Sequence, residues 1–328
     1  MKSFLICLFT ILIWINLFMA PASAQELPIL QDSQQIRDLK LKSVAVYFRA
    51  YANNQKLDSL EVSHVDFDTA GRLVFEKYFR LFDVILYSEA FSYTYTSHGL
   101  PSEKRLKKED HPLTAEDSAM LDFVGGGESE SKWLYEYNKK GQKVKELEFI
   151  KSSNAKPNLS TEYQYDKSGR ISKAIYQNLK FPEQVSSNNR VDLYTYDAHG
   201  RLVLTEMKGT NSNYHQQIEL QYDSAGNILS LQRKVNMANI GSLTRYEYDG
   251  DNQVSSKHFD PGQDTWKSMT ETEYNVQGLK VKESTYSPSG LVSWVSFEYD
   301  KNGLLIRETH FNAQGIKAFA FETVYTTR

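Results

Sequence analysis

The chain has 328 residues, and its 41 acidic side chains slightly outnumber its 38 basic ones, for a formal net charge of −3. This balance excludes a generally basic surface of the kind that binds nucleic acid or an anionic membrane. Its one cysteine, Cys7, lies in an N-terminal apolar segment that we expect to be removed. Disulfide bonds therefore cannot hold the mature protein, although its compartment would permit them.

Residues 1–24 have the pattern of a secretory signal peptide. Lys2 precedes an apolar run from Phe4 to Met19, and Ala22-Ser23-Ala24 supplies small residues for cleavage. A retained membrane anchor is the alternative, because the run is nearly long enough to span a bilayer. We expect an exported protein that is periplasmic, associated with the outer membrane or extracellular. We expect no membrane span in the mature chain, and a polar, flexible lead-in at residues 25–40.

From residue 41 to 328 the chain repeats one short phrase, in which an aromatic residue is followed by an acid or amide, two free positions and a glycine. Examples are EYQYDKSGRI, LYTYDAHGRL, ELQYDSAGNI and FEYDKNGLLI. The residues on both sides alternate between apolar and polar, which predicts β-strands. One unit has the length of a two-stranded hairpin with its return turn. The sequence therefore predicts an all-β fold, a repeat array of antiparallel β-hairpins.

The residue types in the phrase suit a tight turn. An aspartate can start a type I turn and accept a backbone N–H, and a glycine takes the left-handed conformation that ends it. Asn252 stands in the glycine place of one copy, and asparagine tolerates that conformation best among the other residues. The residues to which we assign this structural role are Asp166, Gly169, Asp197, Gly200, Asp223, Gly226, Asp300 and Gly303.

The array is interrupted at residues 101–132, where we expect a long loop. This stretch is charged and contains the flexible run Gly125-Gly126-Gly127, while Thr114 to Leu121 could form a short capped helix. It is either a mobile excursion or a functional loop.

The repeated phrase resembles the YD repeat of bacterial Rhs and teneurin-type proteins, with the best matches at Tyr163 to Ile171 and Tyr194 to Leu202. The resemblance covers roughly residues 63 to 325, and it recurs over many units. It implies a strip of hairpins that spirals into a shell, which larger members use to enclose a toxic C-terminal domain. This chain shows no toxin-like domain or self-cleavage cassette. We therefore expect a small secreted bacterial member with a long, twisted and curled meander sheet, as an open shell or solenoid-like array.

Tyrosines placed just before the turns are the candidate ligand-binding residues. In an array, equivalent positions line up on neighbouring hairpins, so these tyrosines form ladders across one face. One reading is cross-strand packing that sets the register. The other is an aromatic platform on which sugar rings stack. The candidates are Tyr135, Tyr137, Tyr163, Tyr165, Tyr194, Tyr196, Tyr246 and Tyr248.

We expect no catalytic, cofactor or metal site. The histidines are scattered singly, and neither the G-x-S-x-G, the P-loop nor the H-E-x-x-H motif is found in the sequence. The sequence favours a non-enzymatic binding or scaffold protein of the cell envelope, which binds glycan or another envelope protein. One alternative is an accessory subunit of an envelope complex that binds through an edge strand, with Ile316 to Tyr325 as the candidate. A second is a polysaccharide-acting enzyme.

Overall fold

The computed structural model describes residues 33–327, apart from residues 53–54, 83–84, 113–128, 152–154, 181–188, 211–213, 236–239 and 261–264. The predicted signal peptide and the helix predicted at residues 114–121 lie outside the described residues.

The described residues form one short helix and a single sheet of twenty strands. The helix is α2 (Ser33–Asp38), and the strands are β1 (Leu41–Ala52), β2 (Gln55–Phe67), β3 (Leu73–Phe82), β4 (Ile85–Tyr95), β5 (Pro101–Pro112), β6 (Ser129–Tyr137), β7 (Lys143–Phe149), β8 (Leu159–Tyr165), β9 (Ile171–Asn178), β10 (Arg190–Tyr196), β11 (Leu202–Gly209), β12 (His215–Tyr222), β13 (Ile228–Val235), β14 (Ile240–Asp249), β15 (Asn252–Phe259), β16 (Trp266–Tyr274), β17 (Lys280–Ser287), β18 (Gly290–Tyr299), β19 (Leu305–Asn312) and β20 (Lys317–Thr327).

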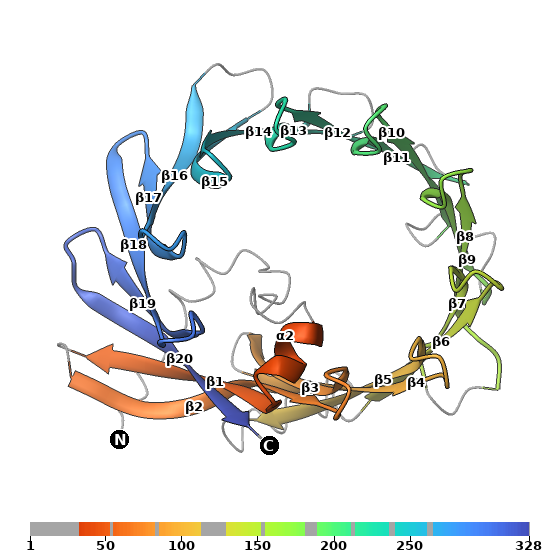
Figure 1. Ribbon diagram of the computed structural model, residues 1–328, viewed down its shortest axis with the longest axis horizontal. Helices are drawn as coiled ribbons and strands as arrows, with labels where there is room; N and C mark the ends of the chain where they lie inside the picture. Colours follow the sequence, from red (N-terminus) through yellow and green to blue (C-terminus); the bar gives the residue numbers. More distant parts are fainter. Residues whose placement is uncertain are drawn as a thin grey trace.

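The sheet closes on itself as a barrel (Figure 1). Each strand pairs antiparallel with the next along the chain, and β1 also pairs antiparallel with β20, from Leu41 opposite Thr327 to Ala50 opposite Phe319. The predicted open, curled or solenoid-like sheet is therefore wrong. The predicted binding edge at Ile316 to Tyr325 is wrong for the same reason, because β20 has a partner on both sides.

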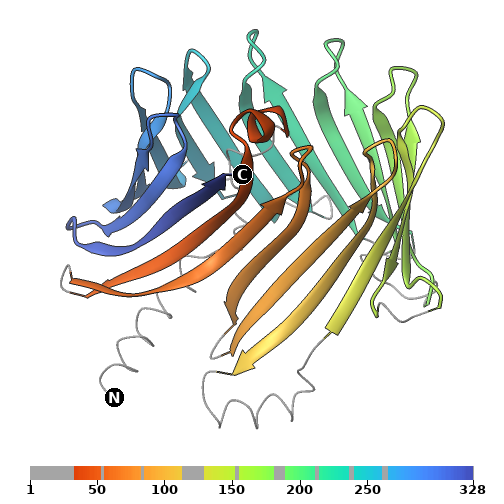
Figure 2. The ribbon, with the colours of Figure 1, turned by 60° about the horizontal axis from the view of Figure 1, so that its bottom comes forward.

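The repeated phrase forms a tight turn at one rim of the barrel (Figure 2). In the copy at residues 197–201, the Asp197 side chain accepts hydrogen bonds from the backbone N–H groups of His199 and Arg201, each at 2.9 Å. Gly200 has φ +84°, a conformation that favours glycine. Asn252 does not take the glycine place that the sequence suggested. It pairs with Asp249 across a shorter turn, and Gly250, with φ +58°, takes the left-handed conformation instead.

Tyrosines near the ends of eight strands tie their hairpins to the preceding ones. Each tyrosine hydroxyl donates a hydrogen bond to a backbone carbonyl at the start of the second strand of the preceding hairpin. This side-chain bond adds to the backbone hydrogen bonds that already join the two hairpins. The donor and acceptor pairs are Tyr95–Leu73 (2.5 Å), Tyr137–Pro101 (2.7 Å), Tyr165–Lys143 (2.6 Å), Tyr196–Ile171 (2.8 Å), Tyr222–Leu202 (2.8 Å), Tyr274–Gln253 (2.9 Å), Tyr299–Lys280 (2.7 Å) and Tyr325–Leu305 (2.9 Å).

The arginine that follows the turn glycine also links two hairpins. The guanidinium of Arg170 pairs with Asp166 of its own turn at 2.7 Å, and it lies 4.4 Å from the ring centre of Tyr196 in the next hairpin. Arg201 repeats both contacts with Asp197 and Tyr222. In the copies that carry this arginine, the acid, the arginine and the tyrosine of the next hairpin therefore act together.

Replacing Tyr196 with phenylalanine tests this link between hairpins. We expect the free energy of unfolding to fall by about 1 kcal/mol, because the Ile171 carbonyl loses its side-chain donor. The midpoint of thermal unfolding, Tm, should fall by about 2 °C. The control is Tyr286→Phe, since the Tyr286 hydroxyl lies on β17 and makes no hydrogen bond to any described residue. Equal effects of the two substitutions would contradict the structural role of the hydroxyl.

The helix α2 identifies the inward face of the sheet, because it lies inside the ring (Figure 1). Its Ile36 side chain packs against Val44, Val65 and Phe67. Side chains alternate along a strand and opposite residues share a face, so these contacts and the strand register assign an inward and an outward face to the paired strands. We call these faces the inner wall and the outer wall. A barrel of this strand number is too wide for inward side chains to meet at its centre.

The best-packed part of the inner wall lies at the seam where β1 meets β20. Ile36, Leu41 and Val44 are at most 3% exposed and pack with residues of β2. Tyr325 of β20 packs against the same cluster, and burial raises its pKa to about 12. The seam therefore holds the ends of the described chain together with an apolar cluster as well as with backbone hydrogen bonds.

Two segments differ from the expected boundaries. The predicted lead-in at residues 25–40 contains α2, whose Arg37 donates to the carbonyl of Ala70 at 2.9 Å. The predicted long loop at residues 101–132 begins with strand β5 and ends within strand β6. The strand β5 could not be recognised from its sequence, because both of its faces carry charged side chains. These side chains form ion pairs, Lys108 with Glu89 and Lys107 with Glu109.

Candidate functional site

Six tyrosines from β3 to β10 form a row on the inner wall, and we call this row the tyrosine belt. Strand register places all six on the inward face. The members are Tyr78, Tyr93, Tyr135, Tyr163, Tyr176 and Tyr194.

The part of the belt on β3 and β4 is organised around one carboxylate. Glu76 accepts hydrogen bonds from the hydroxyls of Tyr78, at 2.7 Å, and Tyr93. The ammonium group of Lys104 lies 3.9 Å from the same carboxylate and 5.3 Å from the ring centre of Tyr93. Desolvation by burial lowers the pKa of Lys104, although the nearby Glu76 opposes this shift.

The part of the belt on β6 to β8 repeats the arrangement with other residues. Lys143 pairs with Glu146 at 2.8 Å and lies over the rings of Tyr135 and Tyr163, 5.2 and 4.8 Å from their centres. The Tyr163 hydroxyl donates to Glu146 at 3.4 Å. A cation, a carboxylate and flanking aromatic rings thus occur twice along the inner wall.

Burial shifts the titration of four belt tyrosines. It raises the pKa values of Tyr93, Tyr135, Tyr163 and Tyr194 well above the ordinary value, and nearby carboxylates raise them further. These hydroxyls therefore stay protonated at neutral pH and can donate hydrogen bonds.

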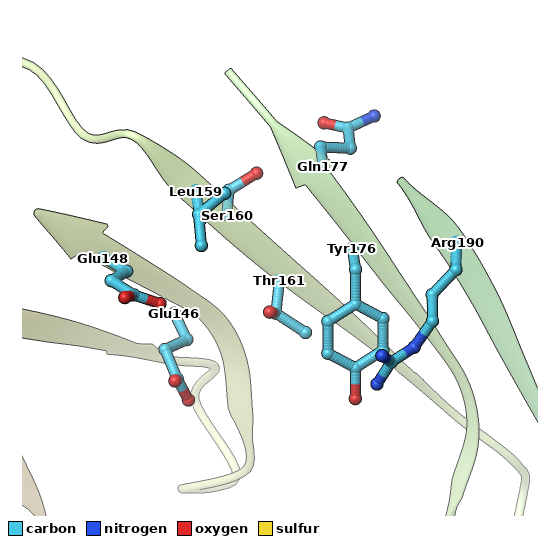
Figure 3. Close-up of a pocket in the computed structure, with 8 residues that line it drawn as sticks. All are labelled: Glu146, Glu148, Leu159, Ser160, Thr161, Tyr176, Gln177 and Arg190. Carbon is cyan, nitrogen blue, oxygen red and sulfur yellow. The ribbon is translucent and has the colours of Figure 1, made fainter. Parts of the chain in front are cut away.

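A pocket of about 210 Å³ opens in the inner wall where the belt crosses β7 to β10 (Figure 3). Thr161 and Leu159 form its floor, and the short Thr161 side chain stands between the longer Glu146 and Tyr176 on the neighbouring strands. One wall carries Glu146 and Glu148, and the opposite wall carries Tyr176 and Arg190, as Figure 3 shows. Ser160 and Gln177 complete the lining.

On the Arg190 side of the pocket, the positive charge of Arg190 is compensated by the carboxylate of Asp192. Arg190 pairs with Asp192 at 3.0 Å, and its guanidinium lies 4.2 Å from the ring centre of Tyr176. Asp192 is only 2% exposed, and burial raises the pKa of its carboxyl despite the arginine. Ala174, which lies between Asp192 and Tyr163 in the register, is completely buried beneath these side chains.

The structure brings some of the predicted tyrosines together and separates others. Tyr135, Tyr163 and Tyr194 belong to the belt, while Tyr137, Tyr165 and Tyr196 lie nearer the rim and donate their hydroxyls to backbone carbonyls. Tyr246 and Tyr248 lie on the same wall but on β14, away from the pocket. Stacking of sugars on any of them remains a prediction.

Several residues of the site carry no signal in the sequence that predicts them. Tyr176, Glu148 and Arg190 lie on strands outside the repeated phrase, so no pattern singled them out. Glu146 does carry a signal, because it stands five residues after a turn glycine. Glu76, Glu283 and Glu308 occupy the same place in their own copies, and each faces the inner wall.

Within the described part of the chain, no group of three or more histidine, aspartate or glutamate side chains is placed to hold a metal ion. No helix there has the length and apolar character needed to cross a membrane.

Comparison with known proteins reveals only loose structural likeness. No family model matches the sequence, and no curated protein matches it. A chain of the Photorhabdus luminescens Tc holotoxin pore is similar over 86% of this chain, with 11% identity and a TM-score of 0.41, and this chain spans only 15% of its length. A porin-like protein from Bacteroides uniformis is similar over 88% of this chain and 97% of its own, with 9% identity and a TM-score of 0.38. These values are too low to assign a function.

Proposed function

We propose that this protein is an exported, non-enzymatic binding protein of the cell envelope, a closed shell whose inner wall binds glycan. The observation that carries the proposal is the tyrosine belt: six inward tyrosines between β3 and β10 with interleaved charged groups, in which burial raises the pKa values of four hydroxyls. Sugar rings stack on aromatic faces, and their hydroxyls exchange hydrogen bonds with polar groups at the ring edges.

The outer wall supports a shell that works in water. Its charged side chains pair across neighbouring strands, and a lysine or arginine on a lipid-facing surface would cost about 2 to 4 kcal/mol near the bilayer centre. The outward pairs include Lys145–Glu162 (3.1 Å), Lys234–Glu219 (2.8 Å), Lys257–Glu247 (3.0 Å), Lys282–Glu273 (2.8 Å) and Arg307–Glu298 (3.2 Å).

The pocket favours binding over hydrolysis. A glycosidase needs two carboxyl groups on opposite sides of the scissile bond. Glu146 and Glu148 project from one strand into the same wall of the pocket, and Tyr176 and Arg190 face them. Asp192, the remaining acid nearby, is buried against Arg190.

Titration of the mature protein with neutral, anionic and amine-bearing oligosaccharides tests the proposal. We expect saturable binding, with a change in tryptophan fluorescence because Trp133 lies next to Tyr135 on the same face of β6. Tyr135→Ala and Tyr163→Ala should each weaken binding about tenfold, the loss expected from one stacking contact. Tyr163→Phe keeps the ring and should retain most of the affinity.

The matched control is Tyr286→Ala, which removes a tyrosine from the outer wall and should leave the affinity unchanged. Circular dichroism of each variant establishes that its barrel is intact. Unaltered binding by Tyr135→Ala and Tyr163→Ala, or no binding to any oligosaccharide, would refute the proposal.

A further inference from the structure

Among the described residues, Glu148 of the inner-wall pocket forms no ion pair, although the two other acids beside the pocket do. Lys143 pairs with Glu146 at 2.8 Å, and Arg190 pairs with Asp192 at 3.0 Å. Glu148 is partly buried, and its described polar contact is the indole N–H of Trp133, a neutral donor. Burial raises the pKa of Glu148, and the charge of Glu146 raises it further.

The remaining walls of the pocket suit one sugar ring. Its volume of about 210 Å³ has room for a single six-membered ring with its substituents, and the floor of Thr161 and Leu159 offers one hydroxyl beside an apolar surface. The ring of Tyr176 stands opposite the two glutamates, as Figure 3 shows. A ligand seated between these walls would meet a carboxylate on one side and an aromatic ring on the other. An ammonium group is stabilised by both partners.

We propose that this pocket selects a sugar that carries a free, protonated amine, with Glu148 as the anion that binds it. The ammonium donates to the Glu148 carboxylate, while Tyr176 and Thr161 contact the ring. This inference rests on the proposed glycan-binding function and names the sugar class for one position on the belt. An N-acetylated or neutral sugar cannot neutralise Glu148, so burial of the carboxylate would count against its binding.

The experiment compares three tetrasaccharide probes by isothermal titration calorimetry near neutral pH: a glucosamine tetramer, its N-acetylated form and a neutral glucose tetramer. We expect the amine-bearing probe to bind about tenfold or more tightly than the other two, the range of a charge-assisted hydrogen bond. Added salt should narrow the difference, because it screens charges in an open site. Glu148→Gln should abolish the preference, and the neutral probe should bind the variant at least as tightly as it binds the parent protein, because no carboxylate is then buried without a counter-charge.

The matched control is Glu162→Gln, which removes a carboxylate from the outer wall of the neighbouring strand and should retain the preference. Equal affinity for the three probes, or a preference that survives Glu148→Gln, would overturn the inference while leaving glycan binding intact. If neither the three probes nor the wider panel of oligosaccharides bind, the proposed function itself is refuted. Binding of trilysine in a Glu148-dependent manner, without binding of the glucosamine tetramer, would also overturn the inference, because the pocket would then recognise a peptide cation.

Discussion

Replacing Val44 with aspartate is expected to open the barrel along the seam between β1 and β20. Val44 is 1% exposed and packs with Ile36, Val65 and Phe67 in the apolar cluster beneath α2. An aspartate there would bury a carboxylate that has no positive partner in the cluster. We expect the free energy of unfolding to fall by at least about 4 kcal/mol, the range of the most damaging core substitutions.

The location of the damage distinguishes opening of the seam from general unfolding. Hydrogen exchange read by mass spectrometry should show lost protection in β1, β2 and β20, while β8 to β11 on the far side of the ring keep theirs (Figure 1). The control is Lys42→Asp, an exposed position on the same strand, which should change stability by less than about 0.5 kcal/mol. Equal loss of protection in all strands would contradict a seam that opens on its own.

The repeated phrase predicted local structure well because the forces involved are local. A turn needs an acceptor at its first position and a left-handed residue near its end, and both appear as residue types at fixed spacing. Closure of the barrel depends instead on β1, which lacks the phrase, meeting β20 at the other end of the described chain. A repeat pattern describes how neighbouring hairpins join, but it carries no information about whether the first and last strands pair. The prediction of an open sheet failed at this step.

The candidate site likewise contains residues that the repeated phrase predicts and residues that depend on how distant strands pack. Tyr135, Tyr163 and Tyr194 belong to the phrase and were found from it, since equivalent positions align on one face. The pocket requires a particular hollow over Thr161 and Leu159, and this hollow arises from the side-chain sizes on four adjacent strands. No spacing in the sequence reports such a combination. Glu148 and Arg190 could be recognised only after the register was known.

The turn aspartates should make the stability of the barrel depend on pH. The backbone N–H of Arg170 donates to Asp166 and holds the pKa of its carboxyl below the ordinary value, and Asn227 does the same for Asp223. Desolvation alone would raise the pKa of Asp197, but hydrogen bonds from Arg201 lower it. A carboxyl whose pKa is lower in the folded state stabilises the fold above its unfolded pKa, about 3.9. The contribution is lost as the pH falls through the folded-state value.

The chain contains natural turns that lack this titration. Asn138 and Asn275 stand in the place of the aspartate, and their side-chain oxygens accept the same backbone hydrogen bonds, from Gln142 and from Leu279, each at 3.0 Å. Because an amide oxygen accepts these bonds without titrating, asparagine should preserve the turn and remove its pH dependence.

The triple substitution Asp166→Asn, Asp197→Asn and Asp223→Asn is therefore expected to flatten the acid limb of the stability profile. Near neutral pH the variant should be slightly less stable, since it loses two surface ion pairs with arginines. Between about pH 5 and pH 2 it should lose less stability than the parent protein, because the three carboxyls that would take up protons on unfolding are gone. Urea unfolding at a series of pH values measures both effects. Asp251→Asn, an exposed acid in the short turn after β14, provides the control, and parallel profiles for the parent and the triple variant would show that the marked turns do not govern the acid response.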